Sequence, residues 1–102
     1  FSQKAKRYLR GQTTKGMSDI VGSDPIGRAV FIELKAKGKR TNISLEQYTF
    51  LMRKIDCYAF AVVVDNSSLL SLYYDKYCLL MKNYQHQEAR NYLREVLPKY
   101  EV

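Results

Sequence analysis

The sequence has no tryptophan, one histidine, two cysteines and two prolines among its 102 residues. No stretch approaches the roughly 18 consecutive apolar residues of a membrane-spanning helix, and the opening FSQKAKRYLRGQ contains no apolar signal-peptide segment. Cys57 and Cys78 lack CxxC spacing, so we expect reduced core thiols rather than a zinc site or a disulfide. His86 has no nucleophile partner pattern and is expected at the surface without chemistry. These absences predict an intracellular, cytoplasmic chain with no membrane partner.

Acidic residues are also few. Seventeen Lys and Arg stand against ten Asp and Glu, which gives a formal charge of +7 and a sequence pI near 9.5. This balance favours a polyanionic partner. A hydrophobic fraction of 46% with 13% aromatic residues predicts a folded chain, and neither a repeat nor a low-complexity linker divides it. Residues 1–102 therefore form one domain.

The hydrophobic periodicity predicts the order β-β-α-β-α-α. Strands over 18–22 and 28–36 form an antiparallel hairpin around the GSDPIG turn, and Ser44 with Gln47 fits a capping box that opens a helix over 44–56. The continuous apolar run YAFAVVVD predicts a strand at the centre of a sheet, parallel to an earlier strand. Helices over 67–82 and 86–97 follow, the second stopped by Pro98. We expect an α/β fold with a small mixed sheet flanked by helices.

Asp19, Glu33 and Lys35 are the candidate chemical residues. The hairpin brings the first two to one region of the sheet, and strand alternation puts Glu33 and Lys35 on one face. Two carboxylates suit a hard divalent cation, and a neighbouring ammonium suits hydrolysis of a phosphodiester. A solvated cross-strand ion pair also explains E-x-K, and Gln47 has a purely structural explanation as the capping-box partner of Ser44.

Four blocks occur in order over residues 15–66: KGMSDIVG, GRAVFIELKAKGKR, SLEQYTFLMRKI and YAFAVVVDN. Together they resemble the VRR-NUC branch of the PD-(D/E)xK nuclease superfamily, which shows a G-x-x-D strand, a hydrophobic strand ending in E-x-K and a helix opening with S/P-x-x-Q. The resemblance implies a restriction-endonuclease-like core and one VRR-NUC-like nuclease domain over residues 1–102. It also implies an Mg²⁺ cofactor, for which Mn²⁺ would substitute.

The resemblance assigns a role to each matching residue. Asp19 and Glu33 correspond to the metal-binding acids, and the backbone carbonyl of Leu34 to a further metal ligand. Lys35 corresponds to the catalytic lysine and Gln47 to the helix glutamine that supports the site. Similar proteins also have an N-terminal helix that often carries another acid, but no acid precedes Asp19 here. We therefore expect either a missing N-terminal segment or a one-metal site.

Basic residues flank these positions on both sides. Arg10, Lys15, Lys37, Lys39 and Arg40 are the expected contacts to the DNA backbone. Stand-alone VRR-NUC proteins look like homodimeric, structure-selective endonucleases, so the resemblance implies cleavage of branched DNA, such as Holliday junctions or flaps, in a bacterial or phage-infected cell. The alternatives are a catalytically inactive nucleic-acid binding module and a non-selective DNA nuclease. Tyrosines of the C-terminal helices are expected in core or dimer contacts rather than as base-stacking platforms: Tyr73, Tyr74, Tyr77, Tyr84 and Tyr92.

Overall fold

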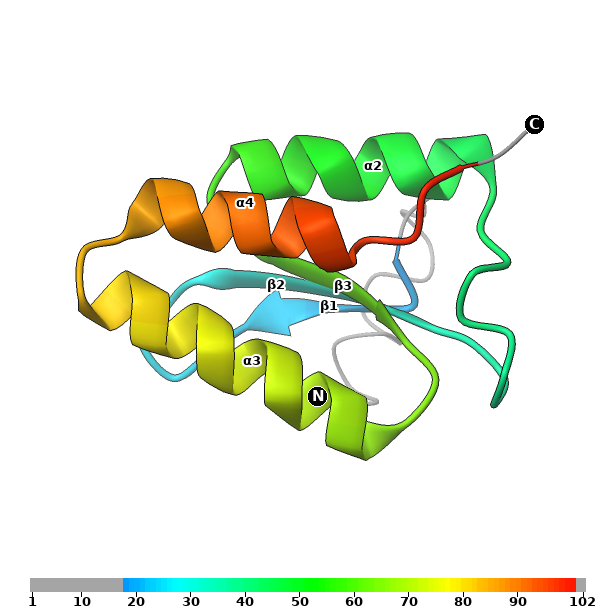
Figure 1. Ribbon diagram of the computed structural model, residues 1–102, viewed down its shortest axis with the longest axis horizontal. Helices are drawn as coiled ribbons and strands as arrows, with labels where there is room; N and C mark the ends of the chain where they lie inside the picture. The colour runs from blue at the N-terminus through cyan, green and yellow to red at the C-terminus, as the bar shows by residue number, and fades with distance from the viewer. Residues whose placement is uncertain (1–17, 101–102) are drawn as a thin grey trace.

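A computed structural model of the chain describes residues 18–100. Its elements follow the predicted order, with bounds that differ from the expected ones by at most two residues (Figure 1). They are β1 (Ile20–Ser23), β2 (Ala29–Leu34), α2 (Leu45–Asp56), β3 (Phe60–Val64), α3 (Ser67–Lys82) and α4 (His86–Val96). Within the described range, no helix combines the length and apolar character that crossing a membrane requires.

The described strands form one mixed sheet in the order β1-β2-β3. β1 pairs antiparallel with β2, with Ile20 opposite Ile32, and β2 pairs parallel with β3, with Leu34 beside Val64. The expected parallel crossover is confirmed, and so is the α/β class. The central position expected for β3 is wrong, because β3 is an edge strand of the sheet that the structure describes.

The burial of β3 comes from helices on both sheet faces rather than from a strand on each side. Phe31 of β2 contacts Phe50 of α2, with ring centroids 5.6 Å apart. On the opposite face, the Phe60 ring of β3 lies 5.2 Å from both Tyr74 and Tyr77 of α3. α4 packs against α2, α3 and β3, so all five residues of β3 are buried (Figure 1). A continuous apolar run thus reports burial, not a central place in the sheet.

Several expected core positions differ from the structure. Tyr73 and Tyr77 are buried as predicted, but the side chain of Tyr84 is 87% exposed. Cys57 and Cys78 are free thiols, as expected, yet Cys57 is exposed because it lies at the end of α2, outside the helix face that packs on the sheet. Tyr84 follows the end of α3 in the same way. Helical periodicity predicts which residues are buried only inside a helix, so it does not apply to residues just beyond a helix end.

Asp24 fixes the turn between β1 and β2. Its Oδ1 accepts hydrogen bonds from the amides of Ile26 and Arg28, at 3.1 and 2.8 Å. Its Oδ2 accepts one from Arg28 Nε at 2.8 Å and one from the Tyr74 hydroxyl at 3.0 Å. Burial raises the pKa of this carboxyl group, but the hydrogen bonds from Arg28 and Tyr74 and the positive charge of Arg28 outweigh burial and leave the pKa below its usual value. Gly27 supplies the left-handed residue of the turn, with φ of 86°.

Candidate active site

Asp19 and Glu33 meet at the end of the sheet away from the β1–β2 turn. Asp19 lies one residue before β1, rather than inside the first strand as predicted, and Glu33 is the penultimate residue of β2. The antiparallel register pairs Ile20 with Ile32, so the next step outward brings Asp19 opposite Glu33. Asp19 Oδ2 accepts a hydrogen bond of 3.0 Å from the Leu34 amide. The hairpin therefore brings the two predicted acids together.

Glu33 is a buried acid with two polar partners. Only 4% of the residue is exposed. Its Oε2 accepts a hydrogen bond of 2.8 Å from Gln47 Nε2 and lies 3.5 Å from Lys35 Nζ. The alternation of β2 explains this placement, because Phe31 and Glu33 face α2 while Val30 and Ile32 face the opposite side. A solvated surface ion pair does not describe Glu33 and Lys35, since their side chains are only 6% and 17% exposed.

Gln47 joins the start of α2 to the sheet. Gln47 and Ser44 form a capping box: the backbone amide of Gln47 donates to Ser44 Oγ at 3.1 Å, and the backbone amide of Ser44 donates to Gln47 Oε1 at 3.0 Å. The same Oε1 accepts a hydrogen bond of 3.2 Å from Lys35 Nζ, while Nε2 reaches Glu33. Gln47 therefore caps its helix and also contacts Glu33 and Lys35, while its role in catalysis stays a prediction.

The electrostatics of Glu33 follow from this arrangement. Burial raises the pKa of Glu33, and the negative charge of nearby Asp19 raises it further. Attraction to Lys35 and hydrogen bonds from Lys35 and the Asp19 backbone lower the pKa but do not cancel the rise. A cation bound between two neighbouring carboxylates would offset the repulsion between their charges.

Asp19 and Glu33 are the candidate ligands for a magnesium ion at this end of the sheet. Asp19 and Glu33 offer carboxylate oxygens, and Mg²⁺ is commonly held by one or two carboxylates and completes its shell with water and substrate phosphate. Residues 18–100 contain no group of three or more Asp, Glu, His or Cys side chains suited to a metal, so Asp19 and Glu33 form at most a two-carboxylate site in this range. The buried Ser18 hydroxyl, next to Asp19, has no hydrogen-bond partner in the described structure, which leaves a polar group for water or ligand. The carbonyl of Leu34 as a ligand stays a prediction.

The predicted DNA-contact residues divide into three groups. Arg10 and Lys15 lie outside the described residues. Lys37 and Lys39 are exposed in the turn that directly follows β2. Arg40 is different: its Nε donates to the Val63 carbonyl at 2.7 Å and its Nη2 donates to the Val96 carbonyl.

Arg40 therefore contributes to the packing of the fold, and its expected phosphate contact stays a prediction. Its guanidinium also lies over the Tyr73 ring, 5.3 Å from the ring centroid. The hydrogen bonds of Arg40 connect the free edge of β3 to the end of α4. Two of the three guanidinium nitrogens are engaged in this way, so we expect Arg40 to contribute less to DNA binding than the exposed Lys37 and Lys39.

Asp65 supports the turn after β2, which the sequence interpretation missed. Its Oδ2 accepts a hydrogen bond of 3.0 Å from the Gly38 amide, which holds the turn that carries Lys37 and Lys39. That hydrogen bond is the main cause of a lowered pKa at Asp65. The signal was present, because the carboxyl ends of parallel strands share one edge of a sheet and Asp65 directly follows β3.

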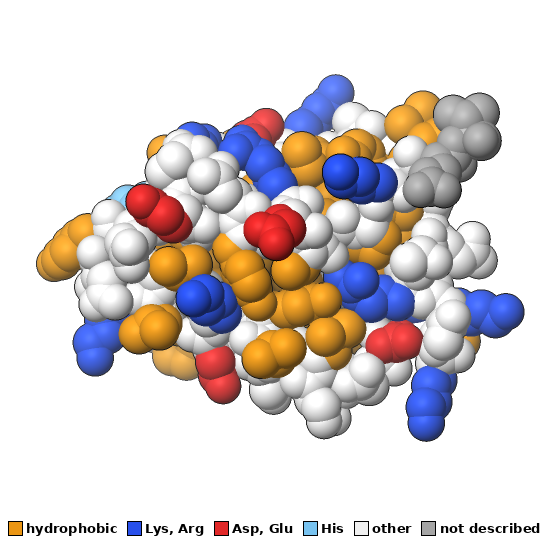
Figure 2. Space-filling view, viewed as in Figure 1, with side chains coloured by type: hydrophobic (Ala, Val, Ile, Leu, Met, Phe, Trp, Pro, Cys, Tyr) orange, Lys and Arg blue, Asp and Glu red, His pale blue; other side chains and the backbone are white. Residues whose placement is uncertain are grey.

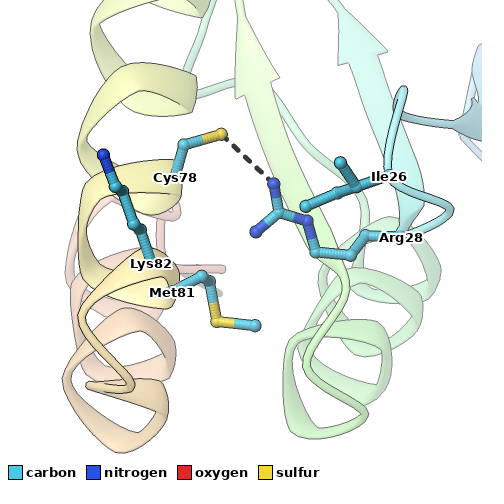
Figure 3. A pocket seen from close by; sticks show the side chains of 5 residues that line it. All are labelled: Ile26, Arg28, Cys78, Met81 and Lys82. Atoms are coloured by element: carbon cyan, nitrogen blue, oxygen red, sulfur yellow. Dashed lines mark hydrogen bonds between the residues drawn. The ribbon is translucent and has the colours of Figure 1, made fainter.

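A shallow cavity of about 330 Å³ lies between the β1–β2 turn and α3, away from Glu33. Figure 3 shows Arg28 extending across it toward Cys78, with Ile26, Met81 and Lys82 around it. Arg28 Nη2 lies 3.4 Å from the Cys78 sulfur, and Arg28 Nε is held by Asp24. Since the Arg28 charge is already balanced, this cavity is a poor site for an anion.

Comparisons of the chain with family models, curated proteins and solved structures found no match in any of the three.

Proposed function

We propose that this protein is a metal-dependent endodeoxyribonuclease of VRR-NUC type, with a PD-(D/E)xK core, that hydrolyses phosphodiester bonds in branched DNA. One observation carries the proposal. Asp19, Glu33, Lys35 and Gln47 come from three separate segments, and hydrogen bonds and an ion pair connect Glu33, Lys35 and Gln47 beside Asp19. A simple surface ion pair between Glu33 and Lys35 would not explain why Glu33 is buried or why Gln47 of α2 is hydrogen-bonded to it.

In this proposal each residue has a separate task. Asp19 and Glu33 hold Mg²⁺ or Mn²⁺, and the Leu34 carbonyl adds a ligand; the ion supplies charge neutralisation at the phosphate when bound. Lys35 orients the attacking water and stabilises negative charge that develops on the phosphate oxygens. Gln47 keeps the Lys35 ammonium and the Glu33 carboxylate at fixed positions through its amide.

The substrate is inferred from charge. A chain of net charge +7 carries Lys37 and Lys39, both exposed, on the turn that adjoins the acids. Such residues contact phosphates without reading sequence, so we expect recognition of DNA shape. The resemblance to VRR-NUC proteins ranks four-way junctions and flaps first as substrates, followed by plain duplex or single strands.

Cleavage of end-labelled DNA tests the proposal. A four-way junction, a matched duplex and a matched single strand are incubated with Mg²⁺, Mn²⁺ or EDTA, using wild type and Glu33→Gln, which keeps the shape of the side chain and removes its charge. We expect metal-dependent cutting of the junction that the substitution abolishes. Cutting by Glu33→Gln at the wild-type rate would refute the assignment of the site.

The competing function is a nucleic-acid binding module without catalysis. The absence of a third acidic ligand among residues 18–100 favours it. Such a module would bind the junction equally well as wild type and as Glu33→Gln, and would cut in neither form with any metal. The same experiment thus separates the two functions.

The proposed homodimer has a candidate surface on the outer side of α3. Leu72 and Leu79 are 60% and 53% exposed there, with Asp75 and Lys76 exposed between them. An antiparallel pair of α3 helices about a two-fold axis would place Leu72 against the partner copy's Leu79 and Asp75 against the partner copy's Lys76. We expect Leu72→Glu to shift the mass measured by light scattering from dimer to monomer; a wild-type monomer would refute this surface.

A further inference from the structure

Helices α2 and α3 end in the same unusual way. In each, the residue after the C-cap is a tyrosine in the left-handed backbone region: Tyr58 with φ of 66° and Tyr84 with φ of 59°. Each tyrosine amide donates to the carbonyl three residues back, and the next amide donates to the carbonyl five residues back. This hydrogen-bonding pattern is the Schellman motif, in which glycine is the usual residue because a side chain makes the left-handed conformation costly.

Burial does not explain why tyrosine occupies these two positions. The Tyr58 side chain is 44% exposed and the Tyr84 side chain is 87% exposed. Tyr84 therefore combines an unfavourable backbone conformation with little gain from packing. Residues that strain a backbone without supporting the core are concentrated at functional positions.

The two tyrosines form one surface with His86, which we call the aromatic patch (Tyr58, Tyr84 and His86). The His86 ring centroid lies 6.0 Å from that of Tyr58 and 6.3 Å from that of Tyr84. The guanidinium of Arg90 lies over the Tyr58 ring, 4.5 Å from its centroid. Both tyrosine turns lie at the left end of Figure 1, and Figure 2 shows hydrophobic side chains protruding at that end.

The surroundings of the aromatic patch are mainly basic. Arg53 and Lys82 are exposed in the last turns of α2 and α3. Of the nearby acids, Asp56 is already paired with Arg94, and Glu88 is exposed in the first turn of α4. Exposed rings beside cationic side chains are the features that hold single-stranded nucleic acid, because each base offers a flat face for stacking and each phosphate needs a positive charge.

We propose that the aromatic patch binds unpaired bases of a single-stranded nucleic acid, with Tyr84 and Tyr58 as the stacking rings and Arg53 and Lys82 as phosphate contacts. The patch lies beyond the starts of β2 and β3, whereas Glu33 lies near the end of β2, so the two sites occupy opposite ends of the sheet (Figure 1). Binding here does not depend on the nuclease proposal.

The test measures binding without cleavage. Fluorescence anisotropy of a labelled oligothymidine is recorded in EDTA with wild type, Tyr84→Gly and Tyr84→Phe, and thermal unfolding is recorded for each protein. We expect Tyr84→Gly to weaken binding about tenfold while its melting temperature stays equal or rises, since glycine relieves the left-handed strain. Tyr84→Phe keeps the ring and should bind like wild type.

Two controls make the result specific. Leu45→Ala removes an exposed apolar side chain at the first residue of α2, at the other end of that helix from Tyr58, and should leave affinity unchanged. An abasic strand of the same length and charge should bind wild type and Tyr84→Gly equally weakly, because it has nothing to stack. Wild-type affinity in Tyr84→Gly, or equal wild-type affinity for the abasic and thymidine strands, would overturn the proposal. Failure of the separate cleavage experiment would leave this proposal standing, because binding is measured here in EDTA, where no metal-dependent cleavage takes place.

Discussion

Gln47 contacts Lys35 with the same atom that caps its own helix: Oε1 lies 3.2 Å from Lys35 Nζ and also accepts the Ser44 amide. The beginning of α2 and the position of the proposed catalytic lysine are therefore mechanically linked. A substitution at this helix end tests whether Gln47 serves the fold, the chemistry or both.

Gln47→Ala should lower both stability and cleavage. Loss of the capping box costs about 1 kcal/mol of unfolding free energy. Loss of the amide frees Lys35 and Glu33 from their fixed positions, so kcat should fall by at least about tenfold. Ser44→Ala is the matched control, because it removes the cap hydroxyl and leaves Gln47 in place. Cleavage is measured well below the melting temperatures of both variants. If both lose cleavage equally, Gln47 acts only by supporting the fold.

Glu33→Gln should change metal binding and pH dependence together. The pKa of Glu33 is raised in the folded protein, so the folded state holds the proton more tightly than the unfolded chain. Stability from this group is therefore present below the unfolded pKa of about 4.3 and is lost as pH rises through the folded pKa. Without metal, the variant should lack this loss and be at least as stable as wild type at neutral pH.

Thermal unfolding with Mg²⁺, Mn²⁺ or EDTA measures the metal part of that prediction. Metal that binds only the folded state should raise the wild-type melting temperature. The rise should vanish in Glu33→Gln and persist in Glu88→Gln, which removes an exposed acid on α4. A metal-induced rise of equal size in all three proteins would place the ion elsewhere.

Asp24→Asn should weaken the protein most at neutral pH. The lowered pKa of Asp24 means that its contribution is present above the unfolded pKa of about 3.9 and is lost as pH falls through the folded pKa. Removing the charge beside partly buried Arg28 should cost about 2–4 kcal/mol at pH near neutrality. Urea unfolding of wild type and variant should converge in acid. Asp75→Asn, at an exposed position of α3, should have the stability of wild type at both acid and neutral pH.

Much of the site was predictable because its contacts are short in sequence or follow from strand pairing. The GSDPIG turn sets the hairpin register that brings Asp19 to Glu33, and the Ser44–Gln47 spacing marks the helix start. Alternation along β2 puts Glu33 and Lys35 on one face. These rules need no knowledge of tertiary packing.

The features that the sequence did not predict depend on contacts between distant residues or on where a helix ends. The carbonyl partners of Arg40 are 23 and 56 residues away, so no local pattern separates this arginine from the solvated lysines beside it. Tyr84 falls on the apolar side of a helical pattern, but α3 ends before it and its backbone turns left-handed. Periodicity gives the face of a residue only while the helix continues.

The difference between Arg40 and its neighbouring lysines gives the last prediction. Arg40→Ala removes charged hydrogen bonds to the carbonyls that join β3 and α4, so it should cost about 1.5–3 kcal/mol of unfolding free energy. DNA affinity, measured where the variant stays folded, should barely change.

The double variant Lys37→Ala with Lys39→Ala should behave in the reverse way, because both side chains are exposed. Its stability should match wild type, while the slope of log affinity against log salt should shrink by about one for each lysine. An unchanged slope in the double variant would remove the turn after β2 from the DNA surface, and a reduced slope in Arg40→Ala would show that the arginine leaves its carbonyl partners to bind phosphate.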